Sequence, residues 1–294
     1  MRRASEMSGA RPRQRLTIQS SRLLLNALVY ALLIAAIIIM CVPLAWMLTV
    51  SVRPNAEVMK IPPDWIPKVF TFEAYQKIFS EKKYITVFAN TCFIALIVTV
   101  LSLTLGSMAA YALARFKFIG HRTVLMFLIT TQMFPLVLLC IPYFRIFITL
   151  GLYDSLSALI IVYLTFTLPF CILMLRSYFL NIPRDMEEAA MVDGCTRLGA
   201  IMRILFPMSY PAFIGAGLYT FLLAWNEFLF AVVLIESWGN RVLTMAIYSL
   251  MAEFVTDWNT MMAFSVLASL PLVVAFVFLQ KYMVQGMTGG ALTS

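Results

Sequence analysis

Six long apolar runs constrain the fold of this chain more than any other feature of its sequence. They lie at roughly 24–51, 86–113, 124–144, 156–175, 212–235 and 260–280. A helix needs about 20 consecutive apolar residues to cross the hydrocarbon core of a bilayer, and each run is long enough. The sequence therefore predicts an all-α polytopic membrane protein with six transmembrane helices and with both termini on the same side.

Composition excludes a soluble globular enzyme. Apolar residues make up 62% of the 294 residues, charged residues make up 12%, and the mean hydropathy is +0.90. Soluble domains are about 45–50% apolar and about 25% charged. The first run is too long for the core of a signal peptide, and Arg53-Pro54-Asn55 follows it in place of a cleavage site. We therefore expect an uncleaved first helix.

Basic residues in the short connections predict the orientation, because Lys and Arg are retained on the cytoplasmic side. The predicted inner segments carry Arg2, Arg3, Arg11, Arg13, Arg15 and Arg22, then Arg115, Lys117 and Arg122, then Arg176, Arg184, Arg197 and Arg203. In the loops 53–84 and 236–258, acidic residues nearly balance or outnumber the basic ones. Both termini are thus predicted to be cytoplasmic, and these two loops are predicted to lie outside.

The remaining composition argues against nucleic-acid, metal and catalytic sites. The net charge of +8 arises at the ends of apolar runs rather than in an aromatic-interleaved basic patch, so lipid orientation explains it and no nucleic acid is expected. None of the five cysteines forms a CxxC pair, and His121 is the only histidine. We expect no metal site and no catalytic residue.

The apolar runs and the loops divide the chain into segments. We expect a surface helix at 72–79 in the first outer loop and a helix at 243–254 in the second. The predicted organisation is a basic cytoplasmic tail at 1–23, a first transmembrane helix with an outer loop at 24–84, a five-helix core at 85–283 and a cytoplasmic C-terminal tail at 284–294. Within the core, 181–211 forms a cytoplasmic loop.

That cytoplasmic loop carries the most informative pattern. Pro183 suits the first turn of a helix and Gly194 suits its left-handed end, so one short helix is predicted between them. A second should run from about Thr196 to Leu205 and stop before Pro207. The two would form a knob, residues 183–207, that projects into the cytoplasm. A solvated helical loop is the alternative, although exposed small and apolar residues among the acids suggest a docking surface.

Within the knob, Glu188-Ala189-Ala190 is followed by Gly194 after three residues, then by Ile204, Phe206 and Pro207. This spacing resembles the EAA motif, E-A-A-x3-G-x9-I-x-L-P, of permease subunits of ABC importers. The chain departs from the motif only at Phe206, where leucine is usual. The segments 111–116, 224–228 and 285–290 are most similar to the smaller permease of maltose-type carbohydrate importers.

The resemblance implies a type I importer permease fold in a bacterial cytoplasmic (inner) membrane. It also implies a complex with a second related permease, two ATP-binding cassette ATPase subunits and an extracytoplasmic solute-binding protein. The chain has no G-x-x-x-x-G-K-[ST] loop, so the ATPase would bind ATP and Mg²⁺ and this chain would need no cofactor. The implied ATPase-coupling residues are Glu187, Glu188, Ala189, Ala190, Asp193, Gly194, Ile204 and Pro207.

Polar residues inside the apolar runs are candidates for the substrate pathway, because a buried acid in a bilayer usually faces a cavity or a partner. The candidates are Trp225, Asn226, Glu227, Asn90 and Gln132. A structural hydrogen bond to the partner subunit is the alternative for Glu227, and for Asn90 and Gln132 we favour bonds between helices. Gly106, Ala110 and Ala114 recur every four residues and predict a helix-packing face.

The resulting hypothesis is a non-catalytic permease subunit that moves a sugar (a mono- or oligosaccharide, a glycoside or a polyol) by alternating access. One alternative is an ABC permease for a non-sugar solute. Another is a secondary transporter that works alone. Inverted repeats and interrupted helices are typical of that class, and the sequence shows neither.

Overall fold

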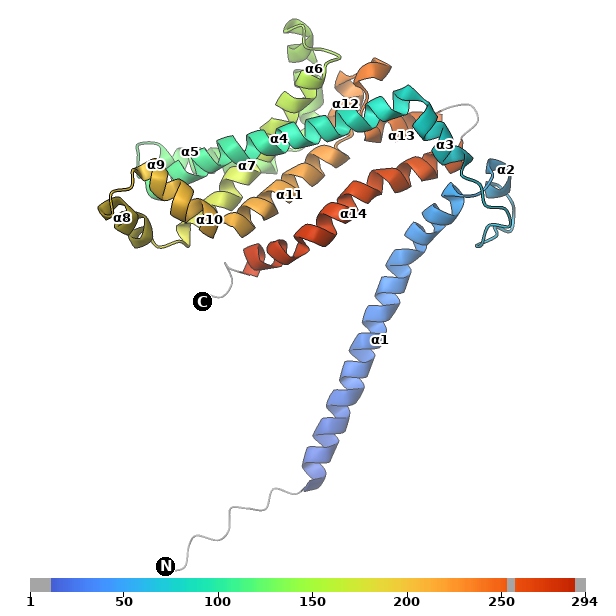
Figure 1. The fold of residues 1–294 in the computed structure, drawn as a ribbon, viewed down its shortest axis with the longest axis horizontal. Helices are drawn as coiled ribbons and strands as arrows, with labels where there is room; N and C mark the ends of the chain where they lie inside the picture. Colours follow the sequence, from blue (N-terminus) through green and yellow to red (C-terminus); the bar gives the residue numbers. More distant parts are fainter. Residues whose placement is uncertain (1–11, 253–256, 289–294) are drawn as a thin grey trace, which may run out of the picture.

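The computed structural model describes residues 12–252 and 257–288, and in these ranges every regular element is a helix. Four helices are long and apolar enough to cross a membrane alone, and two bent helix pairs raise the number to six. The elements, in order along the chain (Figure 1), are α1 (Pro12–Ser51), α2 (Asn55–Val58), α3 (Glu73–Ser80), α4 (Lys82–Arg115), α5 (His121–Met133), η1 (Leu136–Leu139), α6 (Cys140–Thr149), α7 (Leu156–Leu180), α8 (Arg184–Val192), α9 (Arg197–Ala200), η2 (Ile201–Leu205), α10 (Phe206–Met208), α11 (Tyr210–Asn226), α12 (Leu229–Leu234), η3 (Trp238–Asn240), α13 (Leu243–Ala252) and α14 (Trp258–Thr288).

Helix α4 is the centre of the packing. It lies along α7 and α11, and α14 packs on the other side of α11. The predicted small-residue face of α4 is confirmed: Gly106, Ala110 and Ala114 are all buried. A Cβ on Gly106 would lie 2.9 Å from the Sγ atom of Cys171 on α7, so only glycine allows the two backbones to approach this closely.

Helix α1 behaves differently from the other long helices. Its apolar part, Leu25–Ser51, has no buried residue in its most apolar window, and it reaches the rest of the chain mainly through contacts with α14. In Figure 1 it leaves the bundle at its C-terminal end. The helix begins at Pro12, so residues 12–23 of the predicted basic tail continue the first helix; residues 1–11 lie outside the described part of the chain.

Two predicted helices are interrupted, contrary to the sequence analysis. The run 124–144 bends by 96° between His121–Met133 and Leu136–Thr149, because Pro135 holds the preceding Phe134 in an extended conformation. The run 212–235 breaks at Glu227 and Phe228, between α11 and α12. The expectation of uninterrupted runs was therefore wrong at both places.

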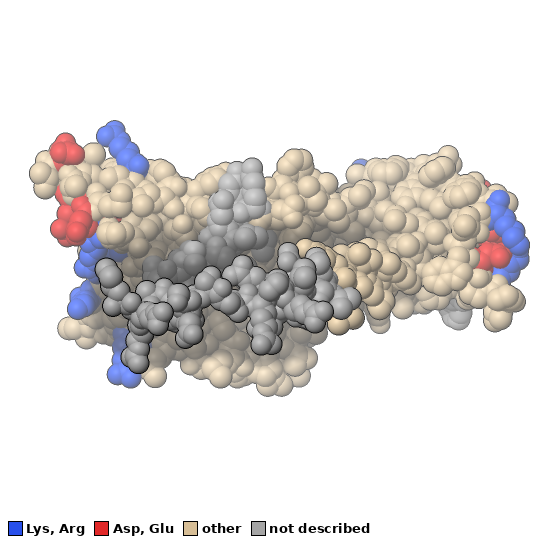
Figure 2. All heavy atoms as spheres, turned by 90° about the horizontal axis from the view of Figure 1, so that it is seen from below, with Lys and Arg blue, Asp and Glu red and all other residues tan. Residues whose placement is uncertain are grey.

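On the face drawn in Figure 2, charged side chains gather at the two ends of the molecule, and the described residues visible between them are almost free of charge. One end carries the knob. We call the other the far end; α3, η3 and α13 lie there, at positions close to the predicted loop helices. Helix α13 ends at Ala252, and residues 253–256 of the predicted helix lie outside the described residues. Helix α14 continues past residue 283 to Thr288, and the last six residues are also outside.

Candidate functional site

The knob is a helix–turn–helix, as the sequence predicts. Helix α8 starts directly after Pro183, and Gly194 follows its end with a φ of +90°. The N–H of Gly194 donates to the carbonyl of Met191, and the N–H of Cys195 donates to the carbonyl of Ala190. This pair of bonds is the Schellman arrangement that ends a helix on a left-handed residue. The predicted local geometry of Gly194 is thus confirmed.

The two adjacent glutamates of the knob point in opposite directions. The Glu187 side chain is only 7% exposed and forms an ion pair with Arg115, whose Nε donates to Oε1 at 2.7 Å. Successive residues on a helix are rotated by about 100°, so burial of Glu187 turns Glu188 outward. Glu188 is exposed, and within the described residues it has no ionic or hydrogen-bond partner.

The other predicted coupling residues divide between the surface and the interior of the knob. Ala189, Asp193 and Gly194 are exposed together with Glu188, whereas Ala190 is buried. Ile204 and Pro207 lie on the second helix of the knob, where Ile204 is half-buried and Pro207 is exposed. The solvent-facing part of the motif therefore extends from Glu188 through Gly194 on one side of α8.

The second helix of the knob is longer than predicted. It starts after Thr196, whose side chain accepts a hydrogen bond from the N–H of Gly199, and it continues through Pro207 to Met208. Residues Ile201–Leu205 form a π-turn, in which the N–H of Phe206 bonds to the carbonyl of Ile201. The helix passes Pro207 because this residue lies in the first turn after the π-turn, and it ends instead at a 75° bend before α11.

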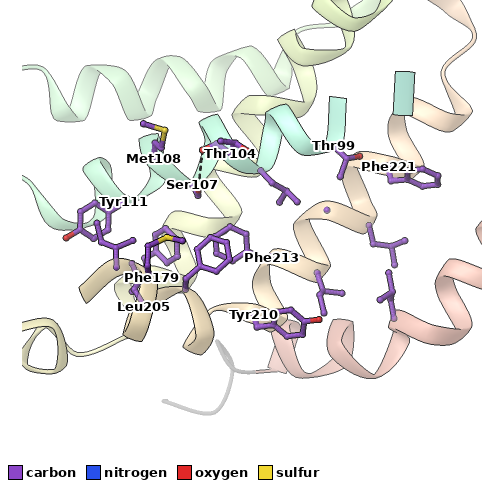
Figure 3. Close-up of a pocket in the computed structure, with 18 of the residues that line it drawn as sticks. Thr99, Thr104, Ser107, Met108, Tyr111, Phe179, Leu205, Tyr210, Phe213 and Phe221 are labelled. Atoms are coloured by element: carbon purple, nitrogen blue, oxygen red, sulfur yellow. Dashed lines mark hydrogen bonds between the residues drawn. The ribbon is translucent and has the colours of Figure 1, made fainter. Parts of the chain in front are cut away.

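A cavity of about 910 Å³ lies beside the knob, between α4, α11, α14 and the second knob helix. Helix α4 contributes hydroxyl groups to its wall, and α11 and the knob contribute aromatic rings (Figure 3). The hydroxyl-bearing residues on α4 are Thr99, Thr104, Ser107 and Tyr111, and the aromatic ones elsewhere include Phe206, Tyr210, Phe213 and Phe221. None of the five predicted pathway residues belongs to this lining.

The predicted pathway residues around the second break are used structurally in this chain. Glu227 accepts hydrogen bonds from the N–H groups of Phe230 and Ala231 and so caps the start of α12. Trp225 is 2% exposed and stacks on Phe221. Asn226 is exposed, and its amide donates to a carbonyl in the preceding turn of α11. The two bonds of Glu227 lie within the chain, so they indicate a capping role that the sequence analysis did not consider.

Asn90 and Gln132 each bond to another segment, the arrangement that the sequence analysis favoured. The Asn90 amide donates to the carbonyls of Gly239 at 2.8 Å and Arg241 at 3.0 Å, and thereby joins α4 to the η3 loop. Gln132, which is exposed, donates to the carbonyl of Phe166 on α7. Within the described ranges, no group of His, Cys, Asp or Glu side chains is arranged to hold a metal ion.

Sequence reasoning did not identify Arg115 as a site residue. The sequence analysis uses it as one of the basic residues that set orientation and as part of the similar segment 111–116, whereas in the structure its side chain is 6% exposed and pairs with Glu187. A signal was available, since Arg115 ends an apolar run and a buried base requires a buried acid within reach. The sequence alone does not say which acid that is.

The chain matches the family described as binding-protein-dependent transport system inner membrane component over residues 102–289. It is 37% identical over 250 residues to the sulfoquinovosyl glycerol transport system permease protein SmoH of Agrobacterium fabrum, covering 85% of this chain and 88% of SmoH. It is 34% identical over 269 residues to the trehalose/maltose transport system permease protein MalG of Thermococcus litoralis, covering 89% and 95%. Its fold resembles a chain of a bacterial ABC transporter involved in the import of alginate, with a TM-score of 0.76, 23% identity and coverage of 90% and 98%.

Proposed function

Because the chain belongs to the family of binding-protein-dependent transport system inner membrane components, we propose that it conducts a sugar, a glycoside or a polyol and that its knob receives the force of ATP hydrolysis. Membership makes the chain a non-catalytic, multi-pass permease of the inner membrane. Such a permease works in an ABC complex with a periplasmic binding protein and ATPase subunits. The interrupted helices therefore do not indicate a transporter that works alone.

We infer one second, related permease that completes the pathway as a heterodimer, and two ATPase subunits beneath the pair. The cytoplasmic tail at 284–294 and the coupling loop at 181–211 would face these ATPases. The binding protein would deliver the solute to the far end, where the outer loops lie.

The exposed face of α8 carries the coupling proposal. Glu188 presents a carboxylate without a partner in the described chain, beside exposed Ala189 and Gly194. A small helix that presents the carboxylates of Glu188 and Asp193, unpaired within the described ranges, beside small side chains suits a groove on another subunit. There Glu188 would pair with a basic side chain, while Gly194 would hold α8 and α9 at a fixed angle.

The choice of a sugar is supported by the relatives and by the chemistry of the cavity. SmoH and MalG are named for sulfoquinovosyl glycerol and for trehalose and maltose, all of which are carbohydrates. The cavity wall carries aromatic rings, which suit the apolar faces of a sugar ring; the hydroxyl groups of Thr99, Thr104, Ser107 and Tyr111 already donate to groups of this chain. Of the five predicted pathway residues, we retain Asn226 as a solute contact because its side chain is exposed.

Charge reversal at Glu188 tests the coupling proposal. We expect Glu188→Lys to release the ATPase subunits from the purified complex or to abolish uptake, because losing one partner of a buried charged pair costs about 2–5 kcal/mol. The matched control is Glu73→Lys, an exposed acid on α3 at the far end, which should keep the ATPase subunits bound. Wild-type ATPase binding and uptake in Glu188→Lys would refute the coupling role.

Uptake measurements test the substrate class separately. The complex is reconstituted into liposomes with its binding protein and ATP and is offered a panel of labelled mono- and disaccharides, glycosides, polyols, amino acids and phosphate. We expect ATP-dependent accumulation of a carbohydrate. Accumulation of an amino acid or of phosphate alone would leave the coupling role standing and would replace the sugar by another solute.

A further inference from the structure

A buried ionic network joins the knob to the centre of the bundle. At its core, the Glu187 carboxylate on α8 accepts two hydrogen bonds from α4. The Arg115 Nε donates to Oε1 at 2.7 Å, and the Tyr111 hydroxyl donates to Oε2 at 3.0 Å. Arg115 and Tyr111 are four residues apart and therefore lie on the same face of α4, so this one face binds both carboxylate oxygens of Glu187. A second Arg115 nitrogen donates to the carbonyl of Ile182, in the link between α7 and α8.

The network also runs from the knob and α7 back to α4. Arg184 on α8 donates to the carbonyl of Ala114, and Arg176 on α7 donates to the carbonyl of Leu113. Both carbonyls lie in the last turn of α4, where carbonyls have no partner within the helix and where positive charge is favoured by the helix dipole. The guanidinium of Arg197 on α9 lies over the ring of Phe116, the residue that follows α4.

Both helices of the knob are therefore tied to the end of α4, which is not adjacent to them in sequence. Helix α4 packs along α7 and α11. Tyr111 makes two kinds of contact: its ring lines the cavity (Figure 3), and its hydroxyl donates to Glu187. A displacement of α8 would thus be transmitted through Glu187 and Tyr111 to the wall of the cavity.

We propose that Arg115 and Tyr111 are positioning residues that lock α8 to α4 through Glu187, so that knob and α4 move as one rigid body during transport. This inference rests on the proposed coupling function and adds to it the helix through which force enters the bundle. Glu188 then faces the ATPase, whereas Glu187 faces α4. The two adjacent carboxylates would thereby connect the ATPase, through Glu188, to α4, through Glu187.

A distance measurement tests the rigid connection in the intact complex. Spin labels are placed on cysteines at Met186 on α8, outside the Glu188–Gly194 face, and at Leu105 on α4, both exposed, in a background without the native cysteines. We expect the distance distribution to be the same with and without ATP. A shift of this distance between the two states in the otherwise unchanged protein would overturn the proposal.

Removing one hydroxyl tests the network without removing a charge. Tyr111→Phe should keep the ATPase bound but should lower the sugar taken up per ATP hydrolysed about tenfold, a usual size for energetic coupling between two sites. It should also broaden the distance between the labels on α8 and α4. The matched control is Tyr248→Phe on α13, because the Tyr248 hydroxyl has no partner in the described chain.

Glu187→Gln extends the test to the ion pair, with the same expected loss of uptake per ATP. If this variant does not assemble, two results decide the question: the uptake per ATP of Tyr111→Phe, and the distance between the labels on α8 and α4 in the protein that keeps Glu187 and Tyr111. Wild-type uptake per ATP in Tyr111→Phe would overturn the proposal. Failure of the proposed function is a separate result, since Glu188→Lys would then retain ATPase binding and uptake whatever the state of Glu187.

Discussion

Glu227 shows how one residue can satisfy a carboxylate inside an apolar segment. Its oxygens accept the N–H groups of Phe230 and Ala231, which are among the donors that a helix start leaves without a partner. The acid therefore compensates for the break between α11 and α12 and stabilises the helix that follows it. Its position in the sequence suggested a pathway residue, but its bonds give it a capping role.

Truncation of this cap should destabilise the complex. We expect Glu227→Ala to lower the free energy of unfolding by about 0.5–2 kcal/mol, as the loss of a helix cap does, and Glu227→Gln to lower it less because one oxygen remains. Thermal unfolding of the purified complex measures both. If both variants melt like the wild type but change the uptake affinity, Glu227 contacts the solute instead.

The neighbouring Glu187 and Glu188 mark the limit of sequence reasoning at this scale. The spacing of the EAA motif was sufficient to identify the segment and to predict the left-handed Gly194. It could not say that Glu187 turns inward, because this depends on where the end of α4 brings Arg115 in space. Local geometry followed from local sequence, and the long-range ion pair did not.

Among the elements, the length and apolarity of the runs predicted the helices, and short polar or proline-containing segments explain where they break. Pro135 interrupts one run and Glu227 with Phe228 interrupts another. Apolar composition alone could not reveal either break, because the segments on both sides of each break are as apolar as an unbroken span. At Pro207 the prediction erred in the other direction, because the π-turn at Ile201–Leu205 lets the helix continue.

The α4–α7 contact is the element pair most sensitive to added volume. We expect Gly106→Val to destabilise the complex by about 1–3 kcal/mol, because its Cβ would lie 2.9 Å from the Sγ atom of Cys171 and overpack the contact. Cys171→Ala in the same chain should restore much of the loss. Gly239→Val is the control, since its Cβ meets no atom within 4 Å. Thermal unfolding that fails to separate the 106 and 239 variants would contradict this packing.

A surface ion pair joins α3 to the start of α14, and its contribution to stability should depend on pH. The Lys77 ammonium lies 2.8 Å from the Asp257 carboxylate. Burial of this carboxyl opposes its ionisation, but hydrogen bonds from Lys77 and Thr260 outweigh burial and lower the pKa of Asp257. A carboxyl with a lowered pKa stabilises the fold above its ordinary pKa, and this contribution disappears as the pH falls through the lowered value.

We therefore expect Asp257→Asn to be less stable than the wild type above about pH 5, and the difference to shrink as the pH falls below the ordinary carboxyl pKa of about 3.9. The difference should be about 1 kcal/mol or less, because the pair is partly exposed. Thermal unfolding of both proteins across this range measures it. A difference that stays constant down to pH 3 would show that the charge of Asp257 does not stabilise the fold.

At the scale of the whole molecule, the chain is an apolar bundle with charged side chains gathered at its two ends (Figure 2). The far end holds the loop helices that the charge asymmetry predicted to be outside, and the knob end holds the motif. Helix α1 is the part that the bundle does not cover. Its position could not be predicted from its sequence, because apolarity predicts a span without predicting its neighbours.

The central claim, that the knob is where the ATPase acts on this permease, is tested most directly by cross-linking in the assembled complex. In a background without native cysteines, Ala189→Cys on α8 and Phe79→Cys on α3 place one reactive thiol at each end of the molecule, both at exposed positions. With a maleimide that carries a benzophenone, which attaches to the thiol and on irradiation inserts into C–H bonds of any adjacent chain, we predict that Ala189→Cys joins the chain to the ATPase subunit and that Phe79→Cys does not. Cross-links to the ATPase from Phe79→Cys, with none from Ala189→Cys, would contradict both the coupling site and the orientation.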